Sequence, residues 1–177
     1  MEYRVYNMTN PISDIQFERI YGILSSSLPQ CEMRSKEMQK QLLNDNRYSL
    51  TVAEDGGTIV GFIAVWKLSG LYFIEHFAVD SKMRNGGIGG KLLEYCVNMY
   101  SPAILEVEPA ESSPEATRRI DFYKRHGFSY NGYEYYQPPL QEGFDLLPLK
   151  IMSYPRSLDQ NDFEKVRNVL YREIYDF

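Results

Sequence analysis

The stretch from Asp80 to Cys96, DSKMRNGGIGGKLLEYC, decides how this chain folds. Four of the five residues from Gly86 to Gly90 are glycines, and an apolar repeat with helical spacing follows at once. Glycine costs backbone entropy, so a cluster of glycines at a helix start indicates that another group must approach the backbone closely. Because the first N–H groups of a helix lack partners and carry partial positive charge, the stretch predicts an anion site.

The order of residues in this turn separates three kinds of phosphate-binding loop. A Walker A loop would need glycine at Asn85 and serine or threonine at Leu92. A dinucleotide-binding GxGxxG loop that starts at Gly87 would need its last glycine at Leu92. A third pattern, Arg or Gln followed by x-x-Gly-x-Gly, fits residues 84–89. A nucleotide-binding enzyme is therefore the weaker alternative, and ATP or NAD would stabilise such a protein more than coenzyme A.

Three strand-like runs with turn signals between them lead into the glycine stretch. These runs cover residues 48–54, 58–68 and 71–79. The residues between them are Asp55-Gly56-Gly57 and Ser69-Gly70, and both junctions predict tight hairpins. The elements expected before these runs are a strand and two helices, over residues 3–8, 11–29 and 35–44.

After the glycines, the pattern alternates between helix and strand and ends in a helix. The expected elements are a helix over 88–100, a strand over 103–108, a helix over 113–127, strands over 128–136 and 146–154, and an amphipathic helix over 158–177. The first strand–helix–strand unit favours one parallel pair. Residues 1–177 are therefore predicted to form a single α+β domain, with a mixed, mostly antiparallel sheet of about seven strands flanked by helices.

Composition and charge narrow the range of partners. The net charge of −5 argues against nucleic-acid binding, which needs clustered Lys and Arg. No run approaches 18 apolar residues and the start, MEYRVYNMTN, lacks a secretory signal, so we expect no membrane span and a cytoplasmic protein. Cys31 and Cys96 lie far apart, and no His, Cys or carboxylate group has metal-ligand spacing, so we expect free thiols and no metal.

Three motifs, in this order, resemble the GNAT superfamily of acetyl-CoA-dependent N-acetyltransferases. They are the strand end FAVD at residues 77–80, the RxxGxG turn and the helix end RRIDFYKRHGF at residues 118–128. The resemblance covers roughly residues 58–128. It implies acetyl-CoA as co-substrate, with the pyrophosphate on the turn and the pantetheine arm along the strand end. The cofactor-binding residues that it implies are Phe77, Ala78, Val79, Arg84, Asn85, Gly86, Gly87, Ile88, Gly89 and Gly90.

The same resemblance implies Tyr123 as the general acid that protonates the departing thiolate. Where many members carry an asparagine that binds pantetheine, seven residues before this tyrosine, the chain has Ala116. Glu75 is the candidate base, because a carboxylate inside an otherwise apolar strand needs a partner or a function, unless it simply faces solvent. An amine with a pKa of about 10.4 is neutral in roughly one part in a few thousand at pH 7, so a base contributes substantially.

These residues predict transfer of an acetyl group to a primary amine of an unidentified small molecule or peptide. We expect the acceptor to enter between the two N-terminal helices and the loop over residues 137–144. Four further aromatic residues either line the acceptor cleft or only pack across strands: Trp66, Tyr133, Tyr135 and Tyr136. A non-catalytic acyl-CoA-binding or regulatory module with the same fold stays an alternative, and a homodimer through the late strands or the last helix stays open.

Overall fold

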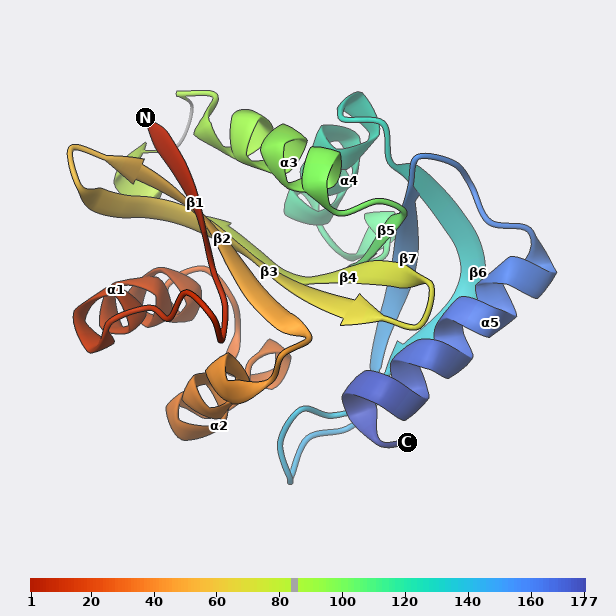
Figure 1. The fold of residues 1–177 in the computed structure, drawn as a ribbon. Helices are drawn as coiled ribbons and strands as arrows, with labels where there is room; N and C mark the ends of the chain where they lie inside the picture. The colour runs from red at the N-terminus through yellow and green to blue at the C-terminus, as the bar shows by residue number, and fades with distance from the viewer. Residues whose placement is uncertain (84–85) are drawn as a thin grey trace.

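The computed structural model describes residues 1–83 and 86–177, so the predictions for Arg84 and Asn85 lie outside the described residues. Seven strands form one sheet in the order β1-β2-β3-β4-β5-β7-β6 (Figure 1). The bounds are β1 Glu2–Tyr6, β2 Tyr48–Asp55, β3 Thr58–Leu68, β4 Leu71–Val79, β5 Ala103–Val107, β6 Ser129–Gln137 and β7 Leu147–Tyr154. Among the described strands, β4 and β5 pair in parallel and the other neighbours are antiparallel, which confirms the predicted sheet.

Both predicted hairpins are present. Asp55 pairs with Thr58 at the end of the β2–β3 ladder, so Gly56 and Gly57 form a two-residue turn. Their φ angles are 55° and 78°, a left-handed region that glycine adopts without a steric penalty. The turn between β3 and β4 is equally short, since Leu68 pairs with Leu71.

In the described residues, five α-helices pack around the sheet, and their ends follow from local capping. Their bounds are α1 Asp14–Ser25, α2 Lys36–Gln41, α3 Ile88–Met99, α4 Pro114–Arg125 and α5 Gln160–Leu170, which continues as a π-helical turn, η5 Tyr171–Tyr175. α1 begins three residues after the predicted Pro11, because Ser13 and Gln16 form a reciprocal capping box. Ser113 caps α4 as predicted, with Pro114 in its first turn. None of the described helices is long and apolar enough to cross a membrane.

The helices form a layer on each face of the sheet. α1 and α2 lie on one face and α3 and α4 on the other (Figure 1). The first core joins α1 and α5 to side chains such as Phe62 and Phe73. The second core joins α3 and α4 to side chains such as Ile63 and Ile74. Consecutive strand residues therefore belong to opposite layers, as the two-residue period of a strand requires.

A β-bulge in β4 interrupts this alternation. Ala64 of β3 pairs with His76, but the next residue, Val65, pairs with Ile74, so Glu75 is the extra residue. Before the bulge, Phe73 belongs to the first core and Ile74 to the second. After it, Phe77 packs against the second core, so the strand has changed phase. The bulge thus turns the side chains of Glu75 and His76 toward the same layer.

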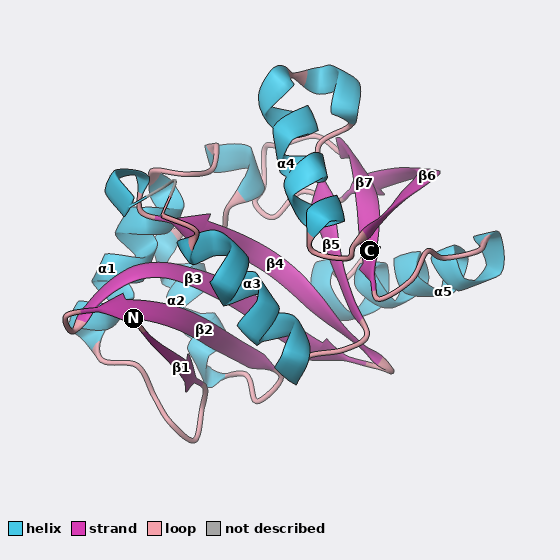
Figure 2. Cartoon of the chain, turned by 90° about the horizontal axis from the view of Figure 1, so that it is seen from above, coloured by secondary structure: helices cyan, strands magenta, loops and turns pink. Residues whose placement is uncertain are grey.

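The two parallel strands separate at the bulge. β4 pairs with β5 from Tyr72–Ala103 to Ile74–Leu105 and no further, although β4 continues to Val79 and β5 to Val107. On their other sides both strands stay paired to their ends: β3 pairs with β4 as far as Val79, and β7 pairs with β5 as far as Val107. In Figure 2 the two strands diverge like the arms of a V. The sheet therefore opens between β4 and β5, beside the predicted cofactor residues at the end of β4.

Candidate active site

A cavity of about 590 Å³ lies in the opening between β4 and β5. The ends of both strands, the start of α3 and one face of α4 line it. Seven predicted cofactor residues are among the lining residues: Phe77, Ala78, Val79, Gly87, Ile88, Gly89 and Gly90. Gly86 lies in the turn but not among the lining residues, and Arg84 and Asn85 are outside the described part. Tyr123 and Glu75 line the same cavity, so the structure brings the two predicted catalytic residues together with the glycine turn.

The glycine turn leaves the N-terminus of α3 open toward the cavity. Gly87 is the N-cap of this helix with a φ of 72°, and as a glycine it has no side chain that could bond to the first N–H groups. A Cβ atom on Gly89 would lie 3.4 Å from the Cζ atom of Phe77 and 3.8 Å from that of Phe122. These glycines therefore add no side chains of their own at the helix N-terminus, where an anion gains from both the N–H groups and the helix dipole.

A leucine at position 89 tests whether this turn binds coenzyme A. In Gly89→Leu the added side chain would project toward Phe77 and Phe122 and fill the approach to the helix N-terminus. We expect coenzyme A affinity, measured by isothermal titration calorimetry, to fall by more than about tenfold, since even one lost charge-assisted contact has this effect. The matched control is Gly22→Leu, because a Cβ on this α1 glycine meets nothing within 4 Å. Unchanged affinity in Gly89→Leu would place the phosphates elsewhere.

Tyr123 sits on α4 with its ring among aromatic neighbours. The ring lies 6.3 Å from that of Phe77 and 5.6 Å from that of Phe128. Burial raises the pKa of Tyr123 to about 12, so the phenol keeps its proton at neutral pH. A protonated hydroxyl in the cavity is what an acid needs before it donates.

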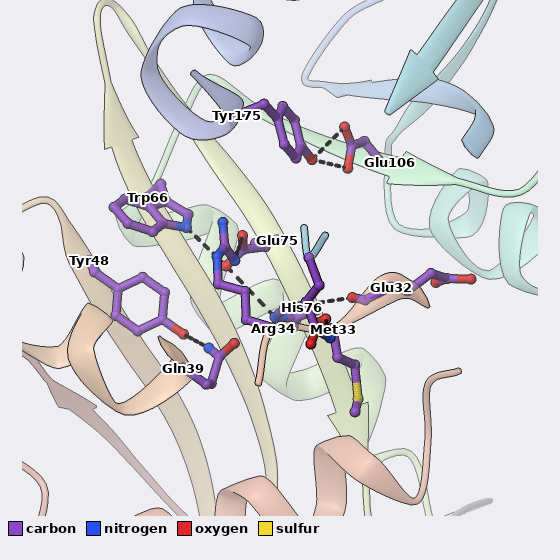
Figure 3. A network of polar contacts seen from close by, with 11 residues as sticks. Glu32, Met33, Arg34, Gln39, Tyr48, Trp66, Glu75, His76, Glu106 and Tyr175 are labelled. Atoms are coloured by element: carbon purple, nitrogen blue, oxygen red, sulfur yellow. Dashed lines mark hydrogen bonds and ion pairs between the residues drawn. The ribbon is translucent and has the colours of Figure 1, made fainter. Parts of the chain in front are cut away.

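Glu75 is held in a buried ion pair instead of facing solvent. Its carboxylate pairs with the Arg34 guanidinium and accepts a hydrogen bond from Trp66 Nε1 at 3.0 Å (Figure 3). Burial alone raises the pKa of Glu75, but Arg34, His76 and the Trp66 N–H together outweigh burial and lower it. The side chain is 3% exposed and that of Arg34 is 8%, so both charges depend on each other. Glu75 is therefore ionised but already engaged.

His76, the next residue, lies beside this pair. Its Nε2 atom is 3.1 Å from the Glu32 carbonyl oxygen, and its Nδ1 atom is 3.7 Å from a Glu75 carboxylate oxygen (Figure 3). Burial lowers the pKa of His76 more than Glu75 raises it, so the imidazole is neutral at pH 7. The ring thus extends the polar wall of the cavity without adding charge.

A second glutamate, Glu106, was not singled out in the sequence. It lies on β5, one residue beyond the last pair with β4, and lines the cavity. Tyr135 donates a hydrogen bond to it, and the Tyr175 hydroxyl lies 2.9 and 2.8 Å from its two oxygens (Figure 3). Burial raises the pKa of Glu106 to about 7 although both hydroxyls lower it. The one sequence signal was the carboxylate itself, inside the apolar run AILEV.

The opening between β4 and β5, the start of α3 and Tyr123 share one cavity, as expected for an acetyltransferase of the GNAT family. Comparisons with known proteins support this family. A family model described as acetyltransferase (GNAT) domain matches residues 46–130, from just before β2 to the start of β6. A GNAT-family protein from Bacteroides thetaiotaomicron, a candidate acetyltransferase by its name, is 31% identical, with a TM-score of 0.88 over 100% of this chain and 99% of that one. The chain therefore belongs to the GNAT family.

Three further relatives are more distant or match only in part. The candidate acetyltransferase YjbC of Bacillus subtilis (strain 168) is 30% identical over 111 residues, 62% of this chain and 56% of its own length, so the match spans about half of that relative. An aminoglycoside 6'-N-acetyltransferase complexed with coenzyme A shares the fold at 16% identity and a TM-score of 0.64, covering 90% and 100% of the chains. A GNAT family acetyltransferase from Elizabethkingia anophelis with acetyl-CoA bound also shares the fold. Its sequence identity is 19% and its TM-score 0.58, over 86% of this chain and 95% of that one.

Proposed function

We propose that this chain transfers the acetyl group of acetyl-CoA to a primary amine of a small molecule or peptide, by direct attack of the amine on the thioester. One observation carries the proposal: the open N-terminus of α3 and Tyr123 line the same cavity, in the gap between two parallel strands. The coenzyme A and acetyl-CoA named in two solved structures of this fold support the same co-substrate.

The donor would lie along β4. Its pyrophosphate fits the N–H groups of the α3 start, which carry the positive end of the helix dipole. Beyond Ile74, no described strand pairs with β4 on the side of β5. Phe77 and Ala78 can therefore offer backbone groups to the amides of the pantetheine arm, in the manner of an added strand, and a role for Val79 stays a prediction.

Tyr123 is proposed to donate its proton to the departing thiolate. A thiol of this kind has a pKa near 8.5 in water, and burial in the same cavity raises its affinity for a proton further. The backbone N–H groups near residues 77–79 would stabilise the oxyanion that forms on the acetyl carbon's oxygen. Ala116 is buried and offers the donor no polar side chain, so these backbone groups hold the pantetheine.

Two glutamates are candidates for the base that takes the proton of the amine. Glu75 stays a prediction, and its ion pair with Arg34 makes it the weaker of the two. We favour Glu106, because it faces the cavity without a cationic partner among the described residues and its pKa of about 7 suits proton transfer near neutral pH. The proton then moves from the attacking nitrogen to a Glu106 oxygen.

The acceptor is proposed to approach from the side opposite α3. Ser27, Leu28 and Glu32 line that side of the cavity from the segment between α1 and α2. Gln137 and Leu140 line it from the end of β6 and the loop that follows. Burial and the nearby Glu108 carboxylate raise the pKa of Glu32, while Arg119 lowers it, so two carboxylates lie close together where a cationic amine would arrive.

The test is coenzyme A release across a panel of amines, with wild type and Tyr123→Phe. We expect Tyr123→Phe to lower kcat by about 10²-fold, because water must then protonate the thiolate. Acetyl-CoA affinity, measured separately by calorimetry, should stay within a factor of two or so, since binding relies on backbone groups. If wild type binds acetyl-CoA but acetylates no amine of a broad panel, the non-catalytic module becomes the better description.

The proposal also covers the domain organisation, the cellular compartment and the oligomeric state. Residues 1–177 are proposed to act as a single N-acetyltransferase domain around one sheet. The free thiols of Cys31 and Cys96 suit a reducing, cytoplasmic environment. A homodimer through β6 or α5 would show as doubled mass in light scattering.

A further inference from the structure

The C-terminal end of the chain reaches the proposed base through an unusual turn. α5 ends at Leu170, and the next five residues form the π-helical turn η5. In an α-helix the residue that follows Leu170 on the same face is four positions on, at Ile174. The wider π-helical turn brings the residue five positions on, Tyr175, to that face as well. Both side chains are partly buried against the first core.

This geometry gives Glu106 two phenolic partners from different elements. The Tyr175 hydroxyl from η5 lies 2.9 and 2.8 Å from the two Glu106 oxygens (Figure 3). The Tyr135 hydroxyl from β6 donates to one of these oxygens. Burial raises the pKa of both tyrosines well above its usual value, so both hydroxyls keep their protons. Neutral phenols that donate to a carboxylate stabilise its ionised form.

The other charged groups around Glu106 act in the opposite direction or are engaged. The carboxylates of Glu75, from β4, and Glu32, from the turn between α1 and α2, raise the pKa of Glu106. The Arg34 guanidinium faces Tyr175 but forms its ion pair with Glu75. No described cation forms an ion pair with Glu106. Its ionised form therefore depends on the two hydroxyls.

We propose that Tyr175 and Tyr135 are positioning residues, whose hydroxyls fix the Glu106 carboxylate at the cavity wall and keep it ionised near neutral pH. The proposal rests on the proposed function in one respect only, namely that the proton taken by Glu106 comes from the attacking amine. The contact itself does not depend on that reaction. The C-terminal turn thereby becomes part of the active site, although it lies far outside the residues that define the family.

The experiment removes one hydroxyl at a time and follows the protonation of Glu106 directly. The probe is the carboxyl carbon-13 NMR signal of Glu106, identified by its absence in Glu106→Gln. In Tyr175→Phe the titration midpoint should rise by about one pH unit, because a hydrogen bond to the ionised form is lost. The acidic limb of the pH profile of kcat/KM should move in the same direction. Tyr135→Phe should act likewise.

The matched control is Tyr171→Phe. Tyr171 lies in the same π-helical turn, but its hydroxyl donates to the carbonyl oxygen of Tyr136 at 2.7 Å and not to Glu106. Its loss should leave the midpoint at the wild-type value. An equal midpoint in wild type, Tyr175→Phe and Tyr135→Phe would overturn the proposal, and if Tyr175→Phe fails to fold, Tyr135→Phe decides it. A shifted midpoint in a protein that acetylates no amine supports the positioning and contradicts only the proposed activity.

Discussion

Glu106→Gln is expected to lower kcat for amine acetylation by about 10³-fold, within the range known for general bases. Glutamine keeps the size of the side chain and its contact with Tyr135 and Tyr175, but it cannot take a proton from the amine. Wild-type activity should fall as pH decreases through about 7, because Glu106 then becomes protonated. The variant should have lost this limb of the profile. Steady-state kinetics between about pH 5 and pH 9, roughly two units on either side of that pKa, measure both effects.

Two controls separate catalysis from folding in this experiment. Glu94→Gln removes an exposed carboxylate on α3 and should leave kcat unchanged. Burial raises the pKa of Glu106 in the folded protein from 4.5 to about 7, so the fold loses stability as pH rises between these two values. Glu106→Gln should therefore be more stable than wild type at pH 8 and lose that advantage at pH 5. Full activity in Glu106→Gln would return the role of base to Glu75.

Arg34→Met is expected to lower the free energy of unfolding by about 3–5 kcal/mol. The substitution leaves Glu75 as an unpaired carboxylate that is 3% exposed, and a buried charge without a partner is strongly unfavourable. At pH 7 the carboxyl group must then either stay charged in an apolar surrounding or bind a proton. Urea denaturation at pH 7, with the slope checked against wild type, measures the loss.

The double variant Arg34→Met/Glu75→Gln identifies the cause. With no charge left to bury, most of the lost stability should return, since a buried ion pair contributes little beyond a well-packed neutral pair. The exposed pair of Lys36 and Glu18, with side chains 49% and 58% exposed, is the comparison. Lys36→Met should cost less than about 1 kcal/mol. If Arg34→Met costs as little, water reaches Glu75 and the ion pair is not a structural requirement.

The parts of the fold that local patterns determine were predictable from the sequence. The Gly56–Gly57 turn, the start of α3 after Gly87 and the cap of α4 at Ser113 all depend on a few adjacent residues. The resemblance to the GNAT motifs linked Tyr123 with the glycine turn, and both line the same cavity. Local patterns were therefore sufficient for these turns and helix ends, whereas the donor half of the site was implied by the family resemblance and stays a prediction.

The rest of the site depends on contacts that strict alternation cannot give. Glu75 pairs with Arg34 because a bulge changes the phase of β4 at that residue, and nothing in the run LYFIEHFAV marks the extra residue. Glu106 meets Tyr175 across 69 positions of sequence, through a π-helical turn that reads as ordinary helix. Trp66 and Tyr135, left open between acceptor cleft and packing, hold the two glutamates instead.

The Gln141 side chain joins the loop after β6 to the segment between α1 and α2. Gln141 Nε2 donates to the Met33 carbonyl oxygen at 2.6 Å, so the two segments that form the proposed acceptor rim support each other. Both segments lie outside residues 46–130, which hold the donor half. Substitutions in this rim would therefore change the proposed acceptor side without altering any residue of 46–130.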